Sequence, residues 1–512
     1  MPSSTNLTAA SSVAPAPRSW LERLWSTIAD RGRPYAHVPD ASAPPLDRAT
    51  RLADALLSER GEASGAAVAR ELHAALRGFD LAGRTAFYRF VSAGFGPDVN
   101  TLRAAAEAYL AEPTPAQAVR LAAAAEPPRQ ELLRRMNIAP GGTAALLRMR
   151  EELLGLLRAE PGLRVLDSDL RHLFASWFNR GFLELRRIDW QTQAAVLEKL
   201  IAYEAVHEIQ GWDDLRHRLD ADRRCFAFFH PALPGEPLIF VEVALVQGLA
   251  EAVQPLLSRD EPPGDPARAD TAIFYSISNC QEGLRGISFG NFLIKQVVEE
   301  LKAELPQITR FSTLSPVPGF RRWLDRQLAG PGTESGSAGA AVFSPEEARR
   351  LSSAVGGTVA DIGDAFRKLT GEDGWWQDPA RAELLRAPLL RLCATYLMRP
   401  DLTRPDPTRP DPTRPGQDGR AVDPVARFHL GNGARLERIN WLGNTSARGM
   451  HESFGMMVNY LYDPDAIEAN HEAYVHSGKV AHSAQIDALL SPRAPQPEPP
   501  PTKPRLSRIR GG

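Results

Sequence analysis

Residues 278–301 read SNCQEGLRGISFGNFLIKQVVEEL and combine three glycines with an apolar periodic segment. The preceding run TAIFYSI is rich in β-branched and aromatic residues and predicts a strand. A strand that passes through a glycine turn into a helix presents backbone N–H groups that can bind a phosphate. Gly283, Gly286 and Gly290 suit this role, because an oxyanion can approach a backbone that lacks Cβ. The same glycines also fit a purely structural turn.

Two common phosphate motifs are missing from this turn. No Walker lysine with a following Ser or Thr is present, which argues against a nucleoside triphosphatase. No GxGxxG follows the strand, which argues against a Rossmann dinucleotide site. The remaining segment resembles the pyrophosphate turn of the GNAT acyltransferase superfamily, which holds coenzyme A, and it reads Arg285-Gly286-Ile287-Ser288-Phe289-Gly290. Ser288 stands where that turn has its middle glycine.

Two side chains elsewhere could perform acid–base chemistry. Ser315 ends ITRFSTLS, a predicted strand, and open α/β sheets bind ligands at the carboxyl ends of their strands. Ser315 fits a turn cap before the next proline equally well. His429 lies in ARFHLGNGARLERINW, where we predict a strand, a tight turn at 431–433 and a second strand. A histidine pKa near 6.5 suits an acid or a base, although a lone histidine on a strand is more often structural.

The elements that must position these residues differ between the two halves of the chain. Residues 47–180 place Leu, Ala and Phe at spacings of three and four, which predicts a bundle of short helices. The second half is mixed. We predict a strand–turn–strand over CFAFFHPALPGEPLIFVEVALV, a helix over 249–257, and helices across 344–398 that open with the capping box SPEE. These elements require one central sheet.

Composition limits the class of partner. The chain has 60 basic and 62 acidic residues among 512, so its charge gives no reason to expect nucleic acid. No apolar run is long enough to span a membrane, and the three cysteines are too far apart for a zinc site. We expect disordered tails at 1–45 and 489–512 and a disordered proline-rich insertion at 399–420.

Taken together, the motifs resemble the malonyl-CoA decarboxylase family across residues 175–465. The stretches that carry the resemblance are FFHPALPGEPLIFVEVAL, FYSISNCQEGLRGISFGNFLIKQVVEEL, FSTLSPVPGF, DPVARFHLGNGARLERINW and SARGMHESFGMMVNYLY. The resemblance implies an α+β fold. An N-terminal all-α helical bundle at 46–185 would serve oligomerisation, as a tetramer or dimer, and a C-terminal GNAT-like mixed α/β catalytic domain at 186–488 would hold one central sheet.

The resemblance also implies roles for single residues. Ser315 and His429 are then the active-site pair, and Ser276 lines the site. The CoA-binding loop comprises Arg285, Gly286, Ile287, Ser288, Phe289, Gly290 and Asn291. Some family members carry a glutamate in place of Ser288, so no carboxylate role is transferred to that position.

The implied substrate is malonyl-CoA, which loses CO2 to give acetyl-CoA. The thioester carbonyl can take the electron pair as an enolate, so we expect no metal and no cofactor. His429 would donate the proton, with Ser315 as its hydrogen-bonded partner. The expected location is the cytoplasm, with the mitochondrial matrix as the alternative. A GNAT-type acyltransferase and a non-catalytic CoA-binding scaffold remain alternative functions.

Overall fold

The computed structural model describes residues 20–36, 43–58, 62–287, 292–329, 342–356, 362–398 and 421–491. Most of the two predicted tails and the whole 399–420 insertion lie outside these residues. The chain forms two compact units. The first unit comprises Met1–Leu245, Pro262–Pro266 and Ser276–Pro306, and the second comprises Val246–Glu261, Ala267–Tyr275 and Gln307–Gly512.

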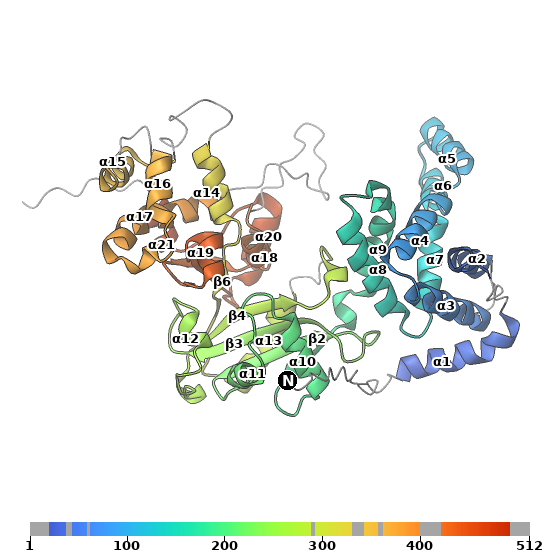
Figure 1. The fold of residues 1–512 in the computed structure, drawn as a ribbon, viewed down its shortest axis with the longest axis horizontal. Helices are drawn as coiled ribbons and strands as arrows, with labels where there is room; N and C mark the ends of the chain where they lie inside the picture. The colour runs from blue at the N-terminus through green and yellow to red at the C-terminus, as the bar shows by residue number, and fades with distance from the viewer. Residues whose placement is uncertain are drawn as a thin grey trace, which may run out of the picture. The chain divides into compact units, whose positions relative to one another are not determined.

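The first unit begins with helices, as the spacing of its apolar residues predicts (Figure 1). Helix α3 packs against α1, α2 and α7. None of the helices in the described part of the chain is both long and apolar enough to cross a membrane. The helices and 3₁₀ turns of this part are α1 (Trp20–Gly32), η1 (Arg33–Tyr35), α2 (Pro45–Ser58), α3 (Glu62–Arg77), α4 (Leu81–Gly94), α5 (Val99–Ala111), α6 (Pro115–Ala125), α7 (Pro128–Asn137), α8 (Gly142–Leu156), η2 (Pro161–Leu163), α9 (Arg164–Trp177) and η3 (Arg180–Phe182).

Strands β1 (Glu184–Ile188), β2 (Arg223–Phe229) and β3 (Pro237–Val246) follow and pair in antiparallel order, which confirms the predicted strand–turn–strand. Helices α10 (Ala194–Tyr203) and α11 (Trp212–Arg218) contribute Leu200 and Leu215 to an apolar core that includes Phe240 and Cys280. Helix α13 (Phe292–Glu304) buries the apolar side predicted for it, including Val297 and Leu301. The turn η5 (Glu282–Leu284) is the element immediately before α13 in the chain.

The second unit is built around strand β8, which pairs antiparallel with β5, β6 and β7. Strand β4 pairs parallel with β5, and the strands form one mixed sheet in the order β1-β2-β3-β4-β5-β8-β6, with β7 on β8. The α+β class, with N-terminal helices and one sheet, is therefore confirmed. The elements that lie wholly or partly in this unit are α12 (Gln254–Leu257), η4 (Pro266–Arg268), β4 (Thr271–Asn279), β5 (Arg310–Thr313), β6 (Ser315–Pro316), α14 (Phe320–Ala329), α15 (Pro345–Ala354), α16 (Ile362–Thr370), η8 (Trp375–Gln377), α17 (Pro379–Met398), α18 (Pro424–Gly431), β7 (Arg435–Asn440), α19 (Ala447–Ser453), β8 (Met457–Leu461), α20 (Ile467–Ser477) and α21 (Ala484–Leu490). Strand β4 is divided between the units, and its residues from Ser276 onward belong to the first.

The prediction that His429 lies on a strand is wrong, because this segment forms helix α18. Asp423 accepts hydrogen bonds from two backbone N–H groups of the first turn and so caps the helix. Pro424 occupies the first helical position, where its missing N–H costs nothing. The residues at 431–433 end this helix instead of forming a hairpin, since the Asn432 N–H donates back to the carbonyl of Phe428.

The helix predicted over 249–257 is also wrong for most of its length. Only α12 forms there, with Pro255 in its first turn. Proline disfavours the α conformation in the residue before it, so a helix that extends upstream of Pro255 is destabilised.

The capping box predicted at SPEE is present, with Ser344 and Glu347 bonded to each other's backbone N–H groups.

The turn before the predicted CoA loop is attached to the N-terminal helices. Arg150 on α8 donates from Nη1 to the carbonyl of Gly283 at 2.7 Å and from Nε to Asp167 at 2.9 Å. A Cβ on Gly283 would lie 2.4 Å from the carbonyl oxygen of Leu147, which is also on α8. Gly283 therefore permits a backbone contact between helix and turn that no other residue would allow.

We expect Gly283→Ala to destabilise the protein by about 1–3 kcal/mol, because two backbones must separate to admit the methyl group. Chemical denaturation of both proteins measures the change. Gly155→Ala is the matched control, since its added Cβ would meet no atom within 4 Å outside its own stretch of helix and alanine favours a helix. Equal stability of wild type and Gly283→Ala would contradict the close contact.

Candidate active site

Ser315 and His429 meet in the second unit. The Oγ atom of Ser315 lies 3.0 Å from Nε2 of His429 and 2.9 Å from Oγ1 of Thr313. Ser315 opens the short strand β6 directly after β5, and His429 lies in the last turn of α18. The other ring nitrogen, Nδ1, lies 2.8 Å from the hydroxyl of Tyr462. Four side chains therefore form one hydrogen-bonded row: Thr313, Ser315, His429 and Tyr462.

The donors and acceptors in this row have a self-consistent order. Ser315 donates its hydroxyl proton to Thr313, so His429 must donate its Nε2 proton to the Ser315 oxygen. A neutral imidazole then has a bare Nδ1, which accepts the hydroxyl proton of Tyr462. The side chain of Asn432 hydrogen-bonds to Tyr462 in turn. Protons can thus pass along the row toward Ser315 without any charged side chain.

Burial keeps His429 neutral. The residue is 3% exposed, and its ring stacks on that of Tyr460 at 4.7 Å between centroids. Desolvation lowers the pKa of His429 to about 3, because the imidazolium would lose its hydration with no compensating charge. Burial also raises the pKa of Tyr462 far above its ordinary value, so its hydroxyl stays protonated. At neutral pH the row holds only neutral groups.

The predicted CoA loop lies in the first unit, and only part of it is described. Arg285 is exposed and forms an ion pair with Glu282 at 3.4 Å. Gly286 has φ of +78°, a conformation that side-chain-bearing residues rarely adopt, and Ile287 is buried. The predicted residues Ser288, Phe289, Gly290 and Asn291 lie outside the described residues. The described residues 285–287 thus offer a turn with a left-handed glycine and an exposed guanidinium.

Ser276 lies in the buried part of β4 and is held by a carboxylate. Its hydroxyl donates to both oxygens of Glu204 at 2.8 Å, and Ser278 donates to the same group at 3.1 Å. Glu204 also accepts the backbone N–H groups of Val206 and His207. Because its proton faces Glu204, the Ser276 oxygen can accept a hydrogen bond but not donate one.

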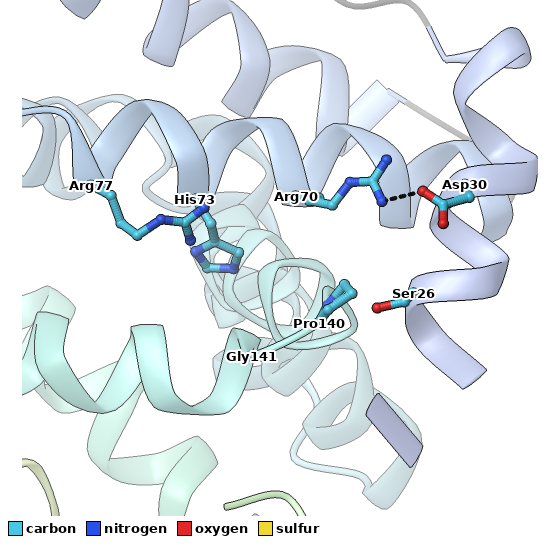
Figure 2. Close-up of a pocket in the computed structure, with 7 residues that line it drawn as sticks. All are labelled: Ser26, Asp30, Arg70, His73, Arg77, Pro140 and Gly141. Carbon is cyan, nitrogen blue, oxygen red and sulfur yellow. Dashed lines mark hydrogen bonds and ion pairs between the residues drawn. The ribbon is translucent and has the colours of Figure 1, made fainter. Parts of the chain in front are cut away.

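A cavity of about 480 Å³ lies among the N-terminal helices (Figure 2). None of the predicted site residues lines it; its walls are Ser26, Asp30, Arg70, His73, Arg77, Pro140 and Gly141. Arg70 already pairs with Asp30 at 2.6 Å, and Nε2 of His73 donates to the carbonyl of Met136 at 2.8 Å. Burial lowers the pKa of His73, which keeps that ring neutral. Arg70 and Asp30 thus pair with each other and His73 is bonded to a backbone carbonyl, so the wall residues include no hydrogen-bonded acid–base pair like that of Ser315 and His429.

Comparison with known proteins identifies the family. The model of the malonyl-CoA decarboxylase C-terminal domain matches residues 181–498, and that of the malonyl-CoA decarboxylase N-terminal domain matches residues 95–178. The C-terminal match alone covers more than half of the chain. The chain belongs to the malonyl-CoA decarboxylase family.

Individual relatives agree with this membership. The mitochondrial malonyl-CoA decarboxylase of Mus musculus is 36% identical over 379 residues, which cover 73% of each chain, and that of Anser anser anser is 35% identical over 371 residues, 71% of this chain and 70% of the relative. The crystal structure of malonyl-CoA decarboxylase from Rhodopseudomonas palustris has a TM-score of 0.75 at 47% identity and covers 87% of this chain and all of that one. The Agrobacterium vitis structure has a TM-score of 0.73 at 47% identity, with the same coverage. Our chain is therefore an enzyme of the malonyl-CoA decarboxylase family.

Sequence reasoning missed three partners of the predicted residues: Thr313, Tyr462 and Glu204. A signal for Tyr462 was present, since tyrosines at 460 and 462 alternate along a strand and share one face of it. Both contact His429, one by stacking and one by hydrogen bonding. Glu204 gave no local signal, because 72 residues separate it from Ser276. In this member of the malonyl-CoA decarboxylase family, these partners determine which atoms of Ser315, His429 and Ser276 donate hydrogen bonds and which accept them.

The depressed pKa of His429 predicts an acid-sensitive fold. The unfolded chain binds a proton at His429 below about pH 6.5, but the folded chain does so only near pH 3. The contribution of His429 to stability is therefore complete above pH 6.5 and decreases as the pH falls toward 3, by at most about 1.4 kcal/mol per pH unit. Urea unfolding of wild type and His429→Gln between pH 4 and 7 measures the slope. The variant should show the smaller slope, and identical slopes would contradict a neutral buried His429.

Proposed function

We propose that this enzyme removes the free carboxylate of malonyl-CoA as CO2 and protonates the resulting enolate at the Ser315–His429 pair. The observation that carries the proposal is the 3.0 Å hydrogen bond between these two buried side chains in a chain of this family. The pair sits at the carboxyl end of β5, an edge of the sheet where α/β folds place their ligands.

The electron pair of the broken bond needs an acceptor. When the bond between Cα and the carboxylate breaks, CO2 leaves and the pair moves into the thioester, which becomes an enolate. A hydrogen-bond donor at the thioester oxygen lowers this barrier. Because the thioester itself takes the electrons, the proposed reaction requires neither a metal nor a cofactor. One proton must then reach Cα, and one proton is consumed in each turnover.

His429 is the proposed proton donor, acting as a neutral imidazole. A carbanion-like enolate carbon is basic enough to take a proton from a neutral N–H or O–H group. The Nε2 proton points at Ser315, so it reaches Cα directly or through exchange with the Ser315 hydroxyl. As Nε2 gives up its proton, Nδ1 can take one from the Tyr462 hydroxyl, and a proton from solvent must then restore that hydroxyl in each turnover, because burial disfavours a lasting tyrosinate. Dry surroundings help the first step as well, because they disfavour the charged carboxylate relative to neutral CO2.

The turn at 285–291 is the proposed site for the pyrophosphate of CoA. Arg285 supplies a positive charge and a planar set of donors, and Gly286 lets the backbone approach the phosphate oxygens. The buried oxygen of Ser276 offers an acceptor for an amide N–H of the substrate.

We further propose that the helices of 46–185 form the interface of a homotetramer or homodimer, and that the enzyme is cytoplasmic or, alternatively, in the mitochondrial matrix.

Purified protein mixed with malonyl-CoA should yield equal amounts of CO2 and acetyl-CoA. Ser315→Ala and His429→Ala should each lower kcat about 10²-fold or more, which is typical for loss of a positioned acid–base group. Ser453→Ala and His451→Ala are matched controls, because the first is a buried serine and the second an exposed histidine on helix α19, outside the hydrogen-bonded row. Full activity in both Ser315→Ala and His429→Ala would refute the assigned roles. Acetyl transfer to an added amine without CO2 would favour an acyltransferase.

Arg285 should act on binding rather than on chemistry. We expect Arg285→Ala to raise KM for malonyl-CoA about tenfold with little change in kcat, since phosphate contacts are made equally in ground and transition states. Glu282→Gln is the matched control: it removes the ion pair of Arg285 and should lower KM or leave it unchanged. A fall in kcat at constant KM would place Arg285 elsewhere in the mechanism.

A further inference from the structure

One fully buried carboxylate connects the segments that carry Ser315 and His429. Asp423 has no solvent exposure. Its Oδ1 atom accepts the backbone N–H groups of Val425 and Ala426 at 2.9 and 3.0 Å, which caps helix α18. His429 is six residues further along this helix, about 9 Å at 1.5 Å per residue. The carboxylate therefore fixes the start of the helix that presents His429.

The other side of the same carboxylate holds the segment that carries Ser315. Its Oδ2 atom accepts the hydroxyl of Tyr396 at 3.1 Å, and the backbone N–H of Gly319 also hydrogen-bonds to Asp423. Gly319 follows Ser315 by four residues, and two of the three residues between them are prolines. Because proline fixes φ, a constraint at Gly319 is transmitted along the chain to Ser315.

The space around this carboxylate is filled. A Cβ on Gly319 would lie 2.2 Å from the Tyr396 hydroxyl oxygen. The Tyr396 ring packs against Phe320 and Trp323 of helix α14, so it cannot move aside freely. An ionised carboxylate accepts hydrogen bonds and donates none, which suits four donors that converge on it. An asparagine would place an NH2 group against some of these donors.

We propose that Asp423 is a positioning residue that holds the segments of Ser315 and His429 at the separation their hydrogen bond requires. Asp423 acts through those two side chains and needs no contact with the substrate. The proposal rests on the proposed function, in which Ser315 and His429 deliver the proton.

The first test compares Asp423→Asn with wild type in malonyl-CoA decarboxylation. We expect kcat to fall at least tenfold while KM stays within twofold, because the pair is displaced but the CoA contacts are not. Ser344→Ala is the matched control, since it removes the cap of another helix of the second unit, α15. That control should lower the melting temperature and leave kcat unchanged. A rise in KM at constant kcat for Asp423→Asn would overturn the proposal.

A double-mutant cycle separates positioning from general loss of structure. In a His429→Ala background both the proposed proton donor and the pair are gone, so adding Asp423→Asn should change the residual kcat less than twofold. If the two losses multiply instead, Asp423 acts independently of His429 and the proposal is wrong. The residual rates are measured in single turnover with excess enzyme.

Milder variants cover the case in which Asp423→Asn does not fold. Tyr396→Phe removes one donor to the carboxylate, and Asp423→Ser keeps the helix cap but is too short to hold Gly319 and Tyr396. Both variants should lower kcat while KM changes little, and the fall in kcat should be larger for Asp423→Ser. Wild-type kcat in both would overturn the proposal. Absence of CO2 release by wild-type protein would instead refute the proposed function.

Discussion

A neutral imidazole buried among hydroxyl groups and aromatic rings is the constraint on which the second unit depends. Water cannot solvate His429, so its pKa falls to about 3 and the ring carries a single proton at neutral pH. Each ring nitrogen must then find a partner of the right kind. Ser315 and Tyr462 satisfy this demand, and the proton order of the whole row follows from it.

Meeting that demand requires three elements that are distant in sequence. Strands β5 and β6 bring Thr313 and Ser315, helix α18 brings His429, and the end of β8 brings Tyr462. Strand β8 pairs with both β5 and β6, so two of the three elements share one ladder of backbone hydrogen bonds. The third element is a helix, and it needs a separate anchor, which Asp423 provides at its first turn.

The first unit applies the same device of a buried polar anchor beneath a predicted binding segment. Arg150 holds the carbonyl of Gly283 just before the predicted CoA loop, and Glu204 holds Ser276. A turn that is fixed at one end loses less conformational entropy when a ligand binds. Anchors of this kind lie far from their partners in sequence, 133 residues for Arg150 and 72 for Glu204.

The sequence by itself determined the family, the helical N-terminal half, the β2–β3 pair and the candidates Ser315 and His429, because these depend on local periodicity and on motifs read in order. It did not determine that His429 lies on a helix: the glycines at 431 and 433 favoured a hairpin, whereas Asp423 and Pro424 provided a helix start. Only the tertiary structure decided the charge of His429 and its partners. Burial sets the charge of His429 and long-range hydrogen bonds set its partners, and neither produces a periodic pattern in the sequence.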